Sequence, residues 1–154
     1  SLLVKLSFKN VITYIQSGNI ILESNLTNLQ EIEGIIQRGL DAKFGYDVNV
    51  LVLKTTELEH VFNNNPYIKT KDISRIGVTL LNDRPDLSHI EYLVARAAQN
   101  EDEFIVNDKC IYMYYPNGQG RSKLTHSMLE KKLNSKATSR NWKTITKLIE
   151  LSNR

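Results

Sequence analysis

Residues 75–81, RIGVTLL, decide the predicted fold, because they open a series of elements that repeats an earlier part of the chain. Their apolar and β-branched side chains are typical of a strand. Turn residues occupy 82–88, and a helix is predicted over about 89–98. Two further strands, EFIV at 103–106 and CIYMYY at 110–115, precede another helix. This part of the chain is therefore predicted as strand, helix, strand, strand, helix.

The beginning of the chain shows a similar order. VITYIQ at 11–16 and NIILES at 19–24 are predicted strands that meet at Ser17-Gly18, where glycine supplies the positive φ of a hairpin turn. A helix follows, with capping-box spacing between Thr27 and Gln30 and a C-terminal cap at Gly45.

The next segment, VNVLVLK at 48–54, is predicted as a strand. Thr56 with Glu59 repeats the capping spacing and indicates a short helix that runs to the stop at 63–66. Residues 2–6 are typical of the end of a helix.

These orders predict an α+β fold made of two ferredoxin-like, βαββαβ-type antiparallel sandwich halves in tandem. We expect the N-terminal half at residues 1–70 and the C-terminal half, which carries basic helices at its end, at residues 71–154. The first strand of the N-terminal half is missing from the series. Since that strand is central in such a sheet, we expect native residues before Ser1, another segment or another subunit to fill its place.

Composition narrows the class of protein. The chain has 154 residues, of which 41% are hydrophobic, enough for a substantial core. Its single cysteine excludes an internal disulfide, and three scattered histidines give no zinc spacing. The longest apolar runs are far shorter than the ~18 residues of a membrane-spanning helix. We therefore expect a soluble cytoplasmic protein with no metal, no cofactor and no membrane partner.

Charge is distributed unevenly along the chain. Residues 121–154 hold nine Lys and Arg against two Glu, whereas residues 1–120 hold 11 basic and 15 acidic residues. This asymmetry is consistent with an anionic partner for the C-terminal part, and equally with a solvated basic face.

The segment PNGQGRSK at 116–123 is the first candidate site. Gly118 and Gly120 allow successive backbone N–H groups to point into one concavity, and the following helix adds positive charge at its N-terminus. Arg121, Ser122 and Lys123 would complete a site for phosphate or carboxylate. A plain strand-to-helix connection, with Ser122 capping the helix, would use the same residues.

A second candidate lies in the segment TSRNW at 138–142. Arg140 and Asn141 would close the anion site if they lie beside the glycine loop, because a guanidinium can grip a phosphate through two donors. Alternatively, Thr138 or Ser139 caps the last helix and Trp142 fills the core. In that helix Arg140 is expected on the same face as Lys143 and Lys147.

No catalytic residue is indicated. Strand alternation places Cys110, Tyr112 and Tyr114 on one face, where the tyrosines either stack on nucleobases or pack beneath helices. Cys110 has no histidine near it in the sequence that would activate it as a nucleophile. The carboxylates form no recognisable pair, so the sequence leaves open whether the protein is an enzyme.

Several separated motifs together resemble a known family. YIQSGNI, the Phe-Gly-x-Asp-Val segment at 44–48, NNNP, YYPNGQGRSKL and ATSRNW occur in the order found in the uncharacterised bacterial family catalogued as domain of unknown function 1697. The resemblance covers nearly the whole chain and implies a duplicated ferredoxin-like fold in a cytoplasmic bacterial protein with no established activity. Members usually open with a strand, a glycine-containing loop and a full first helix, whereas this chain begins near the end of that helix.

The sequence favours a binding module for a phosphate-bearing ligand, including nucleic acid, held by residues 118–123 and the basic C-terminal helix. Two alternatives stay open: an enzyme that acts on a small phosphorylated or carboxylated substrate in a cleft between the halves, and a protein-interaction domain. We expect a monomer or a weak homodimer.

Overall fold

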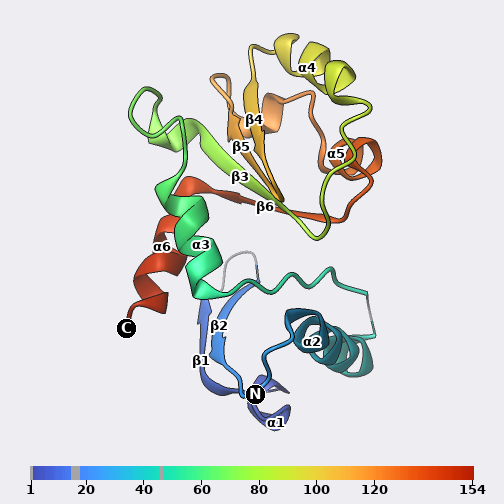
Figure 1. The fold of residues 1–154 in the computed structure, drawn as a ribbon, viewed down its shortest axis with the longest axis vertical. Helices are drawn as coiled ribbons and strands as arrows, with labels where there is room; N and C mark the ends of the chain where they lie inside the picture. Colours follow the sequence, from blue (N-terminus) through green and yellow to red (C-terminus); the bar gives the residue numbers. More distant parts are fainter. Residues whose placement is uncertain (1, 15–17, 46) are drawn as a thin grey trace. The chain divides into compact units, whose positions relative to one another are not determined.

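The computed structural model describes residues 2–14, 18–45 and 47–154. The chain forms two compact units, Ser1–Phe62 with Thr146–Arg154, and Asn63–Ile145 (Figure 1). Each unit contains one antiparallel sheet and helices, so the predicted α+β class is confirmed. The expected division into residues 1–70 and 71–154 differs from these bounds, because residues 146–154 group with the first unit.

The second unit is built on a four-stranded sheet. Its strands lie in the order β4-β5-β3-β6, and every neighbouring pair is antiparallel. Helix α4 follows β3 in the chain and α5 follows β5. The bounds are β3 (Ile76–Leu81), α4 (Ile90–Ala98), β4 (Glu103–Asn107), β5 (Cys110–Tyr114), α5 (His126–Leu133) and β6 (Ala137–Asn141). All of these except β6 were predicted.

Strand β6 was missed because its sequence, ATSRN, has no apolar run. It forms through pairing with β3, from Leu81 opposite Ala137 to Gly77 opposite Asn141. The hydroxyl groups of Thr79 and Ser139 also lie 2.8 Å apart across this pair. The expectation that Thr138 or Ser139 caps the last helix is therefore wrong, since both residues belong to the strand.

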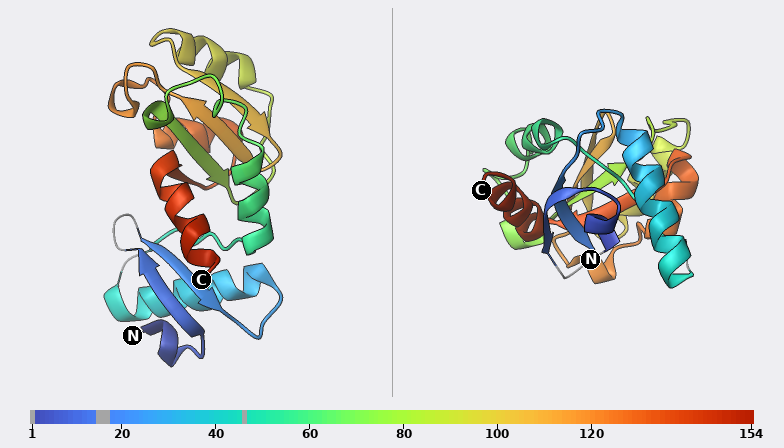
Figure 2. Two further views of the ribbon diagram at one scale, coloured as in Figure 1. Left: turned by 90° about the vertical axis from the view of Figure 1, so that its left-hand side faces the viewer. Right: turned by 90° about the horizontal axis from the view of Figure 1, so that it is seen from below.

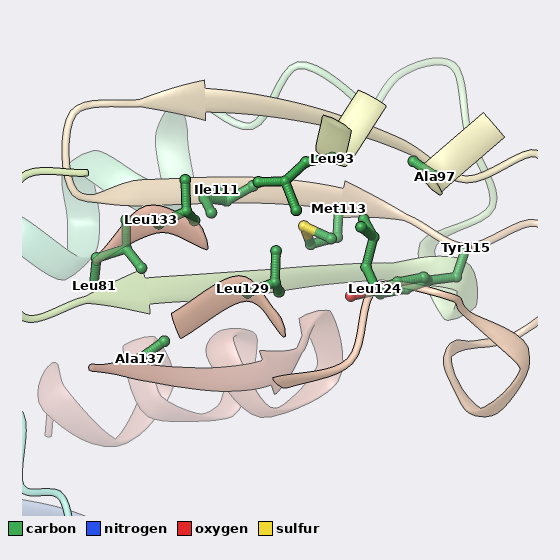
Figure 3. Close-up of a cluster of buried hydrophobic side chains, with 10 residues drawn as sticks. All are labelled: Leu81, Leu93, Ala97, Ile111, Met113, Tyr115, Leu124, Leu129, Leu133 and Ala137. Carbon is green, nitrogen blue, oxygen red and sulfur yellow. The ribbon is translucent and has the colours of Figure 1, made fainter. Parts of the chain in front are cut away.

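The core of this unit fills the space between one face of the sheet and two helices. Figure 2 shows α4 and α5 on the same face of the sheet. Because side chains alternate along a strand, every second residue of β3 and β5 points toward these helices. The buried cluster, drawn in Figure 3, consists of Leu81, Leu93, Ala97, Ile111, Met113, Tyr115, Leu124, Leu129, Leu133 and Ala137.

The alternate residues of β5 point to the other face. Tyr112 is only 1% exposed, so it is not available to stack on a nucleobase. Tyr114 packs against the ring of Tyr67, with 6.0 Å between ring centroids. The ammonium group of Lys71 lies 4.7 Å from the centroid of the Tyr114 ring. The sequence left open whether these tyrosines stack on nucleobases or pack inside the fold, and the structure shows packing inside the fold for Tyr112.

The first unit combines a two-stranded sheet with a long helix, and one face of this helix belongs to the core. Helix α2 crosses one face of the sheet, as Figure 2 shows, and contributes Ile32 and Ile36 to a cluster with Leu3 and Phe8. The bounds are α1 (Leu2–Lys5), β1 (Lys9–Tyr14), β2 (Asn19–Glu23), α2 (Leu29–Phe44) and α3 (Thr55–Asn63). Of the predicted hairpin turn, Gly18 has φ of 70°, whereas Ser17 lies outside the described residues.

The N-terminal caps of the helices in this unit differ from the predicted ones, whereas the C-terminal cap of α2 is confirmed. Asn28, not Thr27, caps α2, because its side-chain oxygen accepts a hydrogen bond from the N–H of Glu31. Gly45 ends α2 with φ of 72°, as predicted. At the start of α3 the Glu57 carboxylate accepts a hydrogen bond from the N–H of Lys54, at 2.9 Å, so the predicted pair of Thr56 and Glu59 is also wrong.

Residues 48–54 form no strand, contrary to the prediction. In the described part of this unit, β1 pairs with β2 and the segment joins neither of them. Its N–H groups turn to other partners, as in the 2.9 Å hydrogen bond from Val52 N to the Glu33 carboxylate. Val50 and Val52 still pack against the core cluster. A strand-like segment with no ladder partner stays outside the sheet. The expectation about the place of the missing first strand stays a prediction.

We predict that Leu133→Ala destabilises the second unit by about 2–5 kcal/mol, because Leu133 is fully buried beneath the sheet and its loss leaves a cavity. Trp142, the single tryptophan, is 4% exposed and belongs to this unit, so its fluorescence during urea unfolding reports the change. Leu87→Ala is the control, since Leu87 is 49% exposed, and should change stability by less than about 0.5 kcal/mol. Equal effects of the two substitutions would contradict the assigned core.

Candidate functional site

The loop at 116–123 leaves the sheet at the end where β3 begins. Tyr114, the last residue of β5, pairs with Ile76, and Asn141, the last residue of β6, pairs with Gly77. Neighbouring strands are about 4.8 Å apart, so β5 and β6 are separated by about 10 Å across β3. The structure therefore brings the glycine loop and residues 140–141 to the same end of the sheet.

The loop is closed by its own backbone hydrogen bonds. Gly118 N donates to Tyr115 O at 3.0 Å, Arg121 N to Gly118 O at 3.2 Å, and Ser122 N to Gln119 O at 3.1 Å. Gly118 has φ of 89°, which favours glycine, and a short 3-10 turn, η2 (Gln119–Arg121), follows it. These three amides are engaged within the loop, so the predicted concavity of successive N–H groups does not form from them.

The helix after the loop begins later than expected. Thr125 caps α5, because its hydroxyl oxygen accepts a hydrogen bond from Met128 N at 3.2 Å. Ser122 does not cap the helix; its hydroxyl oxygen accepts a hydrogen bond from Leu124 N at 3.0 Å. The positive end of α5 therefore lies beyond Lys123, and the charge at the loop comes from side chains.

Three exposed cations gather around the loop. Arg121 and Lys123 belong to it, and Arg75 approaches from the short turn η1 (Ile73–Arg75) that precedes β3. The Arg75 guanidinium lies so close to Gly118 that a Cβ there would be 3.0 Å from its Nη1 atom. Within the described ranges, none of the three forms an ion pair with a carboxylate.

Sequence reasoning missed Arg75, although it stands directly before the quoted strand. Its carbonyl oxygen accepts a hydrogen bond from Tyr115 N at 2.8 Å, which extends the pairing of β3 and β5 up to the loop. Pairing between these two strands was the signal that would have placed it beside Gly118. The Asp72 carboxylate accepts a hydrogen bond from Ser74 N, which lowers its pKa, and the positive charge of Arg75 lowers this pKa by a smaller amount.

Arg140 is half-buried in β6 and Asn141 is exposed at its end, and both side chains have partners within the fold. Arg140 lies in β6, opposite Val78, and not on a helix face with Lys143 and Lys147 as expected. Its Nη1 atom donates to Ser139 O at 2.8 Å, and burial lowers the pKa of its guanidinium. The Asn141 side-chain oxygen accepts a hydrogen bond from Thr144 N at 2.8 Å and so caps α6 (Trp142–Ser152). The exposed cations at the loop are therefore Arg75, Arg121 and Lys123.

A buried polar turn lies against the loop and was also missed. Asn117 donates its side-chain N–H to Asn100 O at 3.0 Å, which ties the loop to the turn between α4 and β4. Asp102, two residues later, is 5% exposed, and neither of its carboxyl oxygens has a hydrogen-bond partner. The buried side-chain nitrogen of Asn100 likewise has none. Strand alternation is the signal that could have found Asp102, since it is in phase with the inward-facing Phe104 and Val106.

Burial raises the pKa values of Asp102, Tyr115 and Cys110. It raises the pKa of the Asp102 carboxyl, and the neighbouring Ser122 hydroxyl lowers it by a smaller amount. The pKa of Tyr115 is raised by burial and, to a smaller extent, by the negative charge of Asp102. Burial also raises the pKa of the Cys110 thiol to about 12, which removes its thiolate at neutral pH and argues against a nucleophilic role.

The loop thus presents three exposed cations, and a buried carboxyl group with a raised pKa lies in the adjoining turn. In the part of the chain that the structure describes, no group of three His, Cys, Asp or Glu side chains lies close enough to hold a metal ion. The described helices are all too short or too polar to cross a bilayer.

Comparisons with known proteins give a family without an assigned activity. The family described as "Protein of unknown function (DUF1697)" matches residues 1–112, and the chain belongs to this family. A solved structure of a conserved bacterial protein from Streptococcus pneumoniae is 18% identical, with a TM-score of 0.67 over 97% of this chain and 84% of that chain. This likeness supports the fold. No curated protein matches the chain.

We predict that Asp102→Asn is more stable than the wild type at about pH 8. The folded protein holds the Asp102 proton more tightly than the unfolded chain does, so the wild type loses stability as pH rises through the folded pKa. The asparagine variant lacks this loss, and the difference should shrink as pH falls toward about 4. Urea unfolding followed by Trp142 fluorescence measures it.

Asp86→Asn is a control of opposite sign. The Ser88 N–H, 2.9 Å from Asp86 Oδ1, lowers the pKa of that carboxyl, so its stabilising effect is present at neutral pH and is lost in acid. Asp86→Asn should therefore be less stable than the wild type at about pH 8. If Asp102→Asn behaved in the same way, the described environment of Asp102 would be wrong.

Proposed function

Taking membership of this family as the premise, we propose that the protein is a binding module for a phosphate-bearing ligand, nucleic acid being the class that we would test first. The ligand contacts the loop at 116–123 and its flanking cations. Gly118 and Gly120 shape the loop, and Arg121, Ser122 and Lys123 face the phosphate. Arg140 and Asn141 support the adjoining strand end.

The observation that carries this proposal is the set of three exposed cations, Arg75, Arg121 and Lys123, that form no ion pair within the described residues. A paired cation has already lost much of its attraction for a ligand, whereas an unpaired one can neutralise a phosphate and release its counterion. Two of the three are arginines, which bind phosphate through two parallel N–H donors.

The loop is also held in one shape before a ligand arrives. Its three internal backbone hydrogen bonds and the bond from Asn117 to Asn100 fix the backbone that carries Arg121 and Lys123. Preorganised groups lose less entropy on binding than mobile ones. This supports a role in recognition over that of a simple connection.

Phosphate contacts would dominate the affinity. Tyr112 is buried, so the sheet offers no pair of tyrosines for base stacking. Contacts to the sugar-phosphate backbone carry no sequence information, and binding through them is steeply dependent on salt. The module should therefore bind single strands with little preference for base sequence.

We also infer that both units are ferredoxin-like. In the second unit the element order from β3 to β6 and the strand order β4-β5-β3-β6 fit a βαββαβ sandwich. In the first unit β1, β2 and α2 correspond to the middle of the same pattern.

The proposal predicts that Arg121→Ala/Lys123→Ala weakens binding of labelled single-stranded RNA and DNA. Each phosphate neutralised contributes about 0.7 to the slope of log affinity against log salt, so losing two contacts should reduce this slope by about 1.4. Affinity is measured by fluorescence anisotropy at about 50 and about 200 mM salt for both proteins.

The matched control is Arg84→Ala/Lys109→Ala. It removes the same two residue types, both exposed, at the opposite end of the same sheet, where Arg84 lies 3.6 Å from the Asp108 carboxylate. It should bind with nearly the wild-type affinity. If the wild type does not bind, or if the two double variants lose equal affinity, the loop is not a nucleic-acid site, and inorganic pyrophosphate becomes the next probe.

A further inference from the structure

We propose that the open edge of β4 is an interaction surface for a second copy of this chain. Two β4 strands pair antiparallel across a two-fold axis at Ile105 and so join two four-stranded sheets into one. This inference goes beyond the proposed function and is independent of it, because the edge of β4 carries none of the cations of the glycine loop.

Strand β4 lies at one end of the strand order and has β5 as its neighbour (Figure 1). Two hydrogen bonds show which residues of β5 face the other way, toward β3. Leu81 N donates to Lys109 O at 2.8 Å, and Tyr115 N donates to Arg75 O at 2.8 Å. Because the direction of hydrogen bonding alternates along an antiparallel strand, the odd-numbered residues of β5 bond to β3 and the even-numbered ones bond to β4.

The backbone groups of Phe104 and Val106 therefore face away from the sheet. The even-numbered residues of β5 lie opposite Asn107, Ile105 and Glu103, whose N–H and C=O groups are thus used within the sheet. Those of the two residues between them point to the open edge. Among the residues that the structure describes, no other strand pairs with this edge.

The opposite edge of the sheet is closed by side chains. By the same alternation, Ala137 and Ser139 of β6 turn their backbone groups outward. Ala137 N donates to the Glu130 carboxylate at 2.8 Å, and the Arg140 guanidinium donates to Ser139 O at 2.8 Å. The chain therefore uses its own side chains to satisfy the edge of β6, and does not do so for β4 within the described residues.

Strand β4 also lacks the features that keep an edge strand from pairing. Its register with β5 has no bulge, and its sequence, EFIVN, contains neither proline nor lysine. Phe104 and Val106 pack against the core, so alternation places Ile105 on the face opposite to the helices, where it is 42% exposed. An open edge with an exposed apolar side chain at its centre is suited to a further strand.

A second β4 fits this edge. With Ile105 opposite itself in an antiparallel pair, Phe104 of one copy lies opposite Val106 of the other, so the outward N–H and C=O groups of both strands find partners. Apolar side chains then meet on both faces of the new pair. Glu103 lies opposite Asn107, whose amide can donate to the carboxylate, and not opposite a second carboxylate.

The association should be weak. Strands as short as β4 bury less surface than the roughly 1,200–2,000 Å² of a stable protein–protein interface. At each end of the pair Asp108 approaches the residue before Glu103 of the second copy, but Arg84 lies 3.6 Å from Asp108 and offsets its charge. We therefore expect a dimer that forms at high protein concentration and dissociates on dilution.

Sedimentation velocity of the full chain between about 5 and about 500 µM tests the proposal. The sedimentation coefficient of the wild type should rise with concentration from that of a monomer toward that of a dimer. Ile105→Lys and Ile105→Glu should each stay monomeric, because like charges would face each other across the axis. An equimolar mixture of these two variants should associate again, since lysine then faces glutamate.

The matched control is Val94→Lys, which adds the same charge at a residue of α4 that is 54% exposed. It should associate as the wild type does. Trp142 fluorescence verifies that each variant is folded. The cations of the glycine loop are unchanged in all of these variants, so the result is separate from the test of nucleic-acid binding.

Several results would overturn the inference. A wild type that stays monomeric at the highest concentration would leave the edge of β4 without a second copy of this chain as its partner. Association of Ile105→Lys at the wild-type level would place the interface elsewhere. Equal losses in Ile105→Lys and Val94→Lys would point to added surface charge as the cause. A mixture of the lysine and glutamate variants that stays monomeric would exclude the two-fold axis at Ile105.

Discussion

The antiparallel pairing of β3 with both β5 and β6 is the constraint on which the second unit depends. Since both neighbours run against β3, both end where it begins, at Ile76 and Gly77. The hydrogen bond from Tyr115 N to Arg75 O continues the pairing past the last residue of β5. Gly77 matters at this point, because a Cβ there would lie 3.2 Å from the Tyr115 ring. The central strand thus determines which cation meets the loop and how closely.

Much of this unit could be predicted because its elements carry their own periodicity. β3, β5 and the core side of α4 are rich in apolar residues at the spacing of a strand or a helix, and burial reinforces that local preference. The glycine loop was recognisable because Gly118 marks a backbone conformation that other residues avoid. The sequence thus indicated where the loop lies and which charged residues it carries.

The remaining features depend on tertiary structure. β6 exists because it pairs with β3, whereas residues 48–54 pair with neither β1 nor β2 in the described part of the first unit, although VNVLVLK is the more strand-like sequence. The N-terminal cap of α2 is Asn28 and not the predicted Thr27. Both residue types are good caps, so backbone geometry decides which of them takes this position. The loop amides were expected to face an anion, but turn formation within the loop engages three of them first.

Solvation explains why Asp102 forms no ion pair with the cations of the loop in the described residues. Arg121 and Lys123 are exposed. If either side chain turned inward to pair with a buried carboxylate, it would lose its hydration, and this desolvation penalty can exceed the Coulombic gain of the ion pair. The fold therefore keeps these positive charges in water and the Asp102 carboxyl group out of it, and this burial raises the pKa of the carboxyl group. Solvation thus accounts for the absence of an ion pair between Asp102 and these cations in the described residues.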